Sequence, residues 1–163
     1  MTASRDDEKM EIIELEEDIR IVGLSLQKSG LPVKFASLGK LWKRYADECR
    51  TQGRGEHPGP STEYAVLLNR VPDTITCAAA DQIEYDDATM TEFVIPRGKY
   101  VKDWFAAESF EALTAQMLPG RDVKGWAQRN GVALDGTFSV EVYPPKRADQ
   151  PLFDMYTLTP VKA

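Results

Sequence analysis

The stretch Thr137–Tyr143, Thr-Phe-Ser-Val-Glu-Val-Tyr, alternates apolar and polar side chains. A period of two is typical of a β-strand with one buried face, so its three apolar residues are expected to enter a core. The opposite face would then carry Glu141 beside Tyr143. This pattern alone leaves two interpretations open: Glu141 belongs to an ordinary solvated strand face, or it is the anionic anchor of a ligand cleft.

The length and composition fit one globular domain. The chain has 163 residues, of which 42% are hydrophobic and 28% charged, and its formal net charge is −6. Such a chain can bury a sizeable core. Its acidic balance, with no basic cluster in the sequence, argues against binding to nucleic acid.

Other features indicate a cytoplasmic protein without a membrane partner. Residues 1–9 are polar and charged, so we interpret them as a disordered leader rather than a signal peptide. No apolar run approaches the ~20 residues that cross a bilayer. Cys49 and Cys77 lack metal-type spacing and are expected to be free thiols, and the lone His57 lies in a loop at 51–62. We therefore expect no metal and no cofactor.

Local patterns predict the sequence βαββ twice. The first half, about 10–86, is expected to contain a strand broken at Glu16–Asp18, a helix over 35–50 and a hairpin. The helix is indicated by the apolar spacing of Leu38, Leu41, Trp42 and Tyr45, and the hairpin by strands at 64–69 and 74–85 around a turn at 71–73.

The second half, about 91–162, follows the same order. It is expected to contain a strand broken at Arg97-Gly98, a helix capped by Ser109, a helical segment with Trp126, the Thr137 strand and a last strand. The sequence thus predicts one α+β domain over 10–163, with an antiparallel sheet and a helix from each half on one face. The seam between the halves is a natural place for a ligand.

Several pieces of the chain, in their order and spacing, resemble one protein family. The pieces are Ile13-Glu-Leu with Ile21-Val-Gly-Leu, Leu38 to Tyr45, Ile95 to Tyr100, Trp126 before Gly131, Val140-Glu-Val-Tyr143, and Tyr156 to Val161. Together they resemble the GyrI-like small-molecule-binding family, which also supplies the effector-binding domain of AraC-type and MerR-type transcription activators. The resemblance covers roughly residues 10–162.

The resemblance implies two βαββ (SHS2-like) repeats around a pseudo-two-fold axis, with a ligand cleft between them. It also implies ligands that are amphipathic, often cationic, aromatic compounds. The acidic residue of its Glu-x-Tyr strand would be Glu141, followed by Tyr143, and the aromatic residues near its pocket would be Trp42 and Tyr64. Two further ligand-binding candidates, predicted to share one strand face, are Tyr100 and Trp104.

The chain departs from the family pattern in two places. Ala80 and Gln82 stand where the family often has a glycine and an acidic residue. After Tyr100 the chain reads Val-Lys-Asp-Trp-Phe, where the family usually has an apolar and aromatic run. These differences bear on the identity of the ligand more than on the fold.

Three functions follow as hypotheses. The first is a stand-alone ligand-binding protein, because a chain of this length is not expected to hold a DNA-binding domain as well. The second is a hydrolase of strained, electrophilic, cyclopropane-type natural products, with Glu141 as acid or base. The third is an inhibitor that binds a protein, since the namesake of the family acts on DNA gyrase. A haem protein is disfavoured because His57 has no evident second ligand.

Overall fold

The structure, a computed structural model, describes residues 10–48, 62–68, 71–79, 90–117, 122–144 and 153–162. The predicted leader, Cys49, His57, Ala80 and Gln82 lie outside these residues. The elements in chain order are β1 (Met10–Leu15), β2 (Ile19–Ser25), a 3-10 helix (Phe35–Ser37), α1 (Leu38–Glu48), β3 (Glu63–Leu68), β4 (Val71–Ala79), β5 (Met90–Ile95), β6 (Gly98–Ala107), α2 (Phe110–Met117), α3 (Val123–Arg129), β7 (Phe138–Tyr143) and β8 (Phe153–Pro160).

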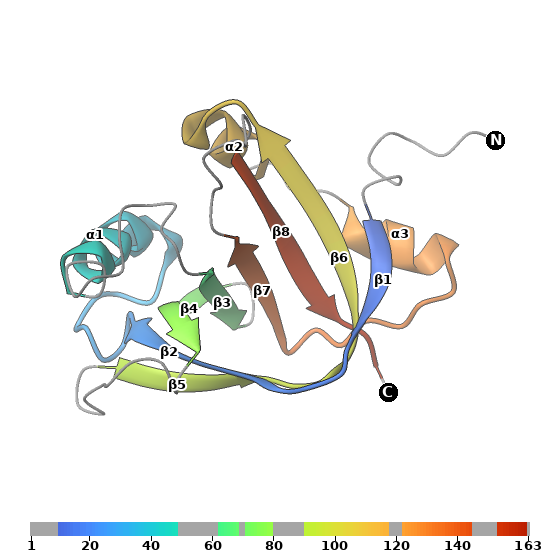
Figure 1. Ribbon diagram of the computed structural model, residues 1–163, viewed down its shortest axis with the longest axis horizontal. Helices are drawn as coiled ribbons and strands as arrows, with labels where there is room; N and C mark the ends of the chain where they lie inside the picture. The colour runs from blue at the N-terminus through green and yellow to red at the C-terminus, as the bar shows by residue number, and fades with distance from the viewer. Residues whose placement is uncertain are drawn as a thin grey trace.

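All eight described strands join in one antiparallel sheet, which confirms the predicted α+β class. Their order across the sheet is β1-β6-β8-β7-β3-β4-β2-β5. The order is symmetric between the two halves of the chain. When β1 is exchanged with β5, β2 with β6, β3 with β7 and β4 with β8, the same list results, read from the other edge of the sheet. The first-half strands meet the second-half strands in the middle, where β3 pairs with β7 (Figure 1).

The two opening strands of each half also pair across the halves. β1 pairs with β6 and β2 with β5, so the two broken strands run side by side and bend at their breaks. There the backbone N–H of Arg97 donates to Oδ1 of Asp18 over 2.8 Å. Gly98 follows with a φ of 137°, a conformation that residues with a Cβ rarely adopt. The predicted breaks are thus confirmed, and they lie against each other.

The two faces of the sheet carry different apolar clusters. The alternation predicted for β7 is confirmed, because Phe138, Val140 and Val142 enter one cluster and Tyr143 the other. The strand cluster consists of Ile21, Val66, Ile95, Tyr100, Val140, Val142 and Leu158, with partly buried residues that include Tyr64, Phe138 and Tyr156. The α1 cluster consists of Val22, Leu24, Leu26, Leu41, Tyr45, Ala65, Phe105, Ala107, Tyr143 and Met155, with Leu31 and Trp42 packed against it.

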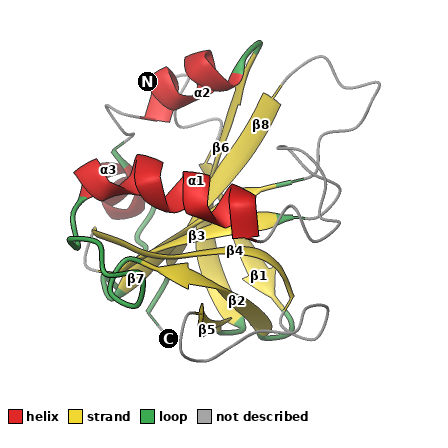
Figure 2. Ribbon diagram, turned by 90° about the vertical axis from the view of Figure 1, so that its left-hand side faces the viewer, coloured by secondary structure: helices red, strands yellow, loops and turns green. Residues whose placement is uncertain are grey.

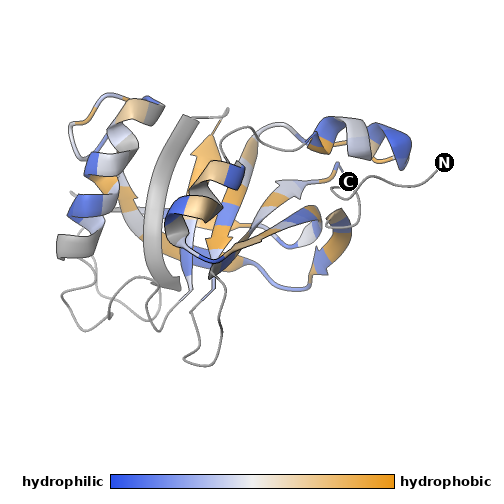
Figure 3. Cartoon of the chain, turned by 90° about the horizontal axis from the view of Figure 1, so that it is seen from above, coloured by the Kyte–Doolittle hydropathy of each residue, from blue (hydrophilic) through white to orange (hydrophobic). Residues whose placement is uncertain are grey.

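Each of the two longer helices contacts strands of its own half. α1 contacts β2 and β4, and it buries Leu41 and Tyr45 as the spacing predicts. α2 contacts β6 and β8, and its predicted cap is confirmed because Ser109 Oγ accepts from the N–H of Ala112. Figure 2 shows α1 lying across the strands, with α2 and α3 at separate positions. Hydrophobic residues occur along the strands, and the helices carry both hydrophobic and hydrophilic residues (Figure 3).

The first hairpin differs from the prediction. Val71 and Pro72 belong to β4, where they face Leu68 and Leu67 across the ladder, so the predicted turn at 71–73 is wrong. The register shifts between Val66 and Leu67, next to Pro72. A proline has no N–H for the ladder and is tolerated at such an irregularity, which explains why a turn residue stands inside a strand.

Among the described helices, none has the combination of length and apolar composition that a membrane crossing requires.

Substituting Gly98 tests the bend in the second broken strand. We expect Gly98→Ala to lower the free energy of unfolding by about 1–3 kcal/mol, because alanine resists positive φ. The cost would be conformational, since nothing lies within 4 Å of the added Cβ. Urea unfolding measures it. Gly136→Ala is the matched control, because nothing lies within 4 Å of its added Cβ either and the φ of Gly136 lies outside the positive range that residues with a Cβ avoid. Equal stabilities of the two variants would contradict this account.

Candidate ligand site around Glu141

β7 directs Glu141 and Tyr143 to the α1 face of the sheet. Residues two apart in a strand share a face, and Tyr143 is buried in the α1 cluster. The Tyr143 hydroxyl donates to Oε2 of Glu141 over 2.9 Å. Across the ladder, Glu141 faces Ala65 of β3 on one side and Thr157 of β8 on the other. The site therefore lies where the two halves of the sheet meet.

Burial sets the electrostatics of this pair. It raises the pKa of the Glu141 carboxyl above its usual value, and the hydrogen bond from Tyr143 partly opposes that rise. Burial also raises the pKa of the Tyr143 phenol well above its usual value, and the negative charges of Glu141 and Glu63 add to the effect. The phenol thus stays protonated as a donor, and the carboxylate is held in surroundings that disfavour its charge.

Aromatic rings from α1 border the pair. The Trp42 ring meets the Tyr143 ring edge to face, with centroids 5.7 Å apart, and meets the Tyr45 ring in the same way at 5.5 Å. Trp42 is partly exposed, whereas Tyr45 is fully buried. The structure therefore brings together three residues that the sequence proposed for the site, Glu141, Tyr143 and Trp42.

Two further acidic residues share this face of the sheet. Glu63 is the cross-strand partner of Tyr143, and it is only 3% exposed. Asp103, 1% exposed, faces Thr157, which in turn faces Glu141. The sequence did not single out Glu63 because its position beside Tyr143 depends on a pairing between residues 80 positions apart. Its only local signal is the shared strand face with Ala65.

The other three predicted residues lie on the opposite face. Tyr64 packs against the strand cluster, and Tyr100 is buried within it at 2% exposure. Burial raises the pKa of Tyr100 to about 12, and its hydroxyl donates to the carbonyl of Pro96. Trp104 is 37% exposed and faces Tyr156 across the ladder. Tyr100 and Trp104 do share a strand face, as predicted, but the structure does not bring these three residues to Glu141.

Several known structures are similar to this chain in fold. The chain is similar to SAV2435 bound to tetraphenylphosphonium, with 11% identity, coverage of 94% of each chain and a TM-score of 0.58. It is also similar to the Vibrio cholerae integron cassette protein VCH_CASS2, with 15% identity, coverage of 94% of this chain and 96% of that one, and a TM-score of 0.57. A third similar structure, EcmrR in a complex with DNA, has 16% identity and a TM-score of 0.60 over 94% of this chain and 57% of that one.

The chain has the GyrI-like fold. The three likenesses confirm the fold expected from the sequence pieces, and they extend over nearly the whole chain. No protein-family model matches the sequence, and no curated protein matches it significantly. At such low identities the likenesses establish the fold alone, so the function has to be argued from the site itself.

The raised pKa of Glu141 predicts that ionisation of this residue destabilises the folded chain. A carboxyl whose pKa is raised by folding holds its proton more tightly in the folded chain, so ionisation destabilises that state. This penalty is absent at pH values below the usual glutamate pKa and grows as the pH rises through the raised one. We therefore expect Glu141→Gln to gain stability relative to the wild type between about pH 4 and about pH 7.5.

Urea unfolding at both pH values measures this difference. Glu11→Gln is the matched control, because it removes one carboxylate from an exposed position of β1. A stability difference for Glu141→Gln that stays constant with pH, or that shrinks towards neutral pH, would contradict the electrostatic account of the site.

Proposed function

We propose that this protein is a cytoplasmic binder of amphipathic aromatic cations and that Glu141 is the anionic anchor. The observation that carries the proposal is the partly buried Glu141 carboxylate, whose pKa is raised by burial and which Trp42 and Tyr143 border. An ionised carboxylate in such surroundings is costly unless a positive charge accompanies it. Among the described residues, no lysine or arginine forms an ion pair with Glu141. A cationic ligand would supply that charge.

The neighbouring rings suit the apolar part of such a ligand. Trp42 is partly exposed beside Tyr143, so a flat group could pack against the indole while its positive charge approaches Glu141. A cation over an aromatic face gains about 0.5–2 kcal/mol. Few directional contacts are needed in such a site, which favours a range of aromatic cations over one specific compound.

Long-range charge favours the same ligand class. The whole chain has a formal net charge of −6. An anionic protein attracts cations and repels anions before contact. A ligand of the same chemistry is also present in a similar structure, since SAV2435 is bound to tetraphenylphosphonium, an aromatic cation.

The place of the site supports a cleft between two repeats. Ala65 and Trp42 come from the first half and Glu141 and Tyr143 from the second, and they meet where β3 pairs with β7. The reversible strand order is the order that two βαββ repeats around a two-fold axis would produce. We propose that the ligand enters at this seam, on the face occupied by α1.

Two tetraphenyl ions of nearly the same shape and opposite charge test the proposal. We expect tetraphenylphosphonium to bind in isothermal titration calorimetry and tetraphenylborate not to bind, because Glu141 selects for positive charge. Glu141→Gln should weaken tetraphenylphosphonium binding by about tenfold or more, as expected for loss of a charged contact. Glu11→Gln should leave it unchanged. Equal affinities for the two ions, or an unaltered affinity in Glu141→Gln, would refute the anchor role.

A hydrolase remains the second candidate, because a carboxyl with a raised pKa beside a phenol also suits general acid or base catalysis. Incubation with a strained spirocyclopropane, followed by mass spectrometry, separates the two functions. A ring-opened water adduct that forms with the wild type and not with Glu141→Gln would identify an enzyme. Saturable binding of that compound without such a product would identify a binding protein.

A further inference from the structure

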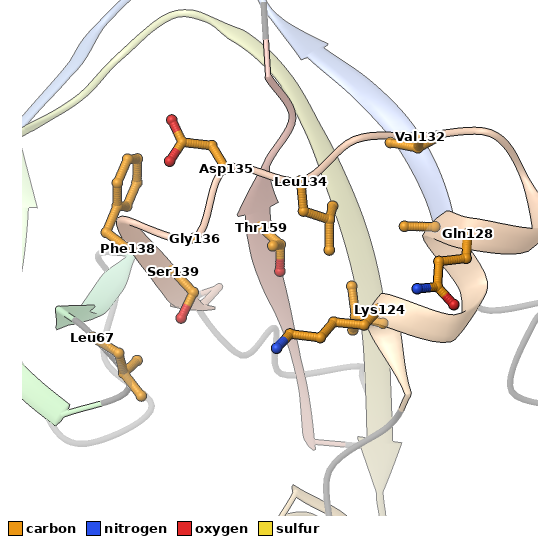
Figure 4. A pocket seen from close by; sticks show the side chains of 12 residues that line it. Leu67, Lys124, Gln128, Val132, Leu134, Asp135, Gly136, Phe138, Ser139 and Thr159 are labelled. Atoms are coloured by element: carbon orange, nitrogen blue, oxygen red, sulfur yellow. The ribbon is translucent and has the colours of Figure 1, made fainter.

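A separate groove lies between α3 and the sheet. Its volume is about 500 Å³, and it contains none of the residues Glu141, Tyr143 or Trp42. Its apolar lining includes Leu67, Val123, Leu134 and Phe138, and its polar lining includes Lys124, Gln128, Asp135, Ser139 and Thr159. We call this space the α3 groove. Figure 4 shows its lining residues, which come from α3, the segment after α3, and strands β3, β7 and β8.

The wall formed by α3 is fixed by packing and by backbone hydrogen bonds. Trp126 and Ala127 are buried against Met10 and Val101, so one side of the helix is held by β1 and β6. The Asp122 carboxylate caps the helix by accepting from the N–H of Gly125 over 2.9 Å. A Cβ at Gly125 would lie 2.1 Å from that carboxylate, which explains the glycine.

The segment that follows α3 is tied to the last strand. Asp135 N–H donates to the carbonyl of Pro160 over 2.8 Å, and Lys162 N–H donates to the carbonyl of Ala133 over 2.9 Å. These bonds hold Leu134 and Gly136 above the start of β7, where both line the groove. The groove is therefore framed by ordered backbone on two sides and by the sheet beneath.

The polar groups at the Lys124 end of the groove favour a negative charge. The one carboxylate of the lining, Asp135, accepts from the N–H of Thr137 over 3.1 Å, and Figure 4 shows it directed away from Lys124. Lys124 is an exposed residue of α3, and Figure 4 shows its amine extended towards the Ser139 and Thr159 side chains. Gln128 follows Lys124 by one helical turn and lines the same space. Within the described residues, no carboxylate forms an ion pair with Lys124. An ammonium and two hydroxyl groups above an apolar floor are complementary to a carboxylate on an apolar body.

The acidic face next to the groove fixes the orientation of such a ligand. Ser139 lines the groove, and Glu141 follows it two residues later on the same face of β7, about 7 Å along the strand. A carboxylate would be repelled at that end by the ionised Glu141 carboxylate. The charge of an anionic ligand is therefore expected at Lys124, and its apolar part beneath α3.

We propose that the α3 groove is a second ligand site, selective for carboxylate-bearing amphipathic small molecules, with Lys124 as the anion anchor. A volume of about 500 Å³ lies within the range of ordinary small-molecule sites. The site is separate from the cation site at Glu141, so either one can exist without the other.

The experiment uses 2-naphthoate and the neutral 2-naphthamide as probes in isothermal titration calorimetry of the full chain. We expect 2-naphthoate to bind saturably with one molecule per chain and 2-naphthamide to bind much more weakly. Lys124→Gln should weaken 2-naphthoate binding by about tenfold or more. Lys40→Gln, which removes a positive charge from an exposed position of α1 distant from α3, should bind as the wild type does (Figure 1).

Glu141→Gln separates this proposal from the cation site, because loss of the repelling carboxylate should leave 2-naphthoate binding at least as tight as in the wild type, while tetraphenylphosphonium binding is weakened. Circular dichroism of each variant verifies the fold, and Lys124 is exposed, so its replacement removes no buried side chain. Absence of saturable 2-naphthoate binding to the wild type, equal affinities for the acid and the amide, or an unchanged affinity in Lys124→Gln would each overturn the proposal.

Discussion

The antiparallel pairing of β3 with β7 is the constraint on which the site depends. It joins the two halves of the sheet, and its register sets Ala65 opposite Glu141 and Glu63 opposite Tyr143. Because strand side chains alternate, a shift of one residue would turn Glu141 towards the strand cluster and Val142 towards α1. The apolar alternation of β7 resists such a shift, since Val140 and Val142 are both buried. Core packing thus fixes the position of the Glu141 carboxylate.

Under the proposed function, that position of Glu141 places stability and binding in opposition. A core residue at 141 would be expected to be apolar, yet the chain holds a carboxyl there in surroundings that raise its pKa. The hydrogen bond from Tyr143 compensates only part of the cost of burial. Groups of this kind concentrate at functional sites because a ligand can supply the interaction that the folded chain lacks. Burial of the two apolar clusters of the sheet contributes the folding free energy that offsets the cost of burying this carboxyl.

Much of the fold was predictable from local patterns, since alternation, helical spacing and capping depend on neighbouring residues. The β7 alternation, the burial of Leu41 and Tyr45 in α1 and the Ser109 cap are of this kind. The hairpin turn was misplaced because Pro72 has the chemistry of a turn residue but sits at a strand irregularity.

The site was only partly predictable, because its composition depends on which strands pair. Glu141 and Tyr143 could be found from one strand, and Trp42 from the family resemblance. Tyr64 and Tyr100 are aromatic residues on strands, and nothing in their local sequence shows that their face is opposite to that of Glu141. Glu63 and the α3 groove arise from contacts between distant segments, so they became visible only in the structure.

The pH dependence of tetraphenylphosphonium affinity is the most direct measurement of the central claim. If the cation binds to an ionised Glu141 whose pKa is raised by burial, the affinity should fall as the pH is lowered through that raised value, and the dependence should disappear in Glu141→Gln. The same pH dependence in the wild type and in Glu141→Gln would contradict the claim, because the charge that selects the cation would then lie elsewhere.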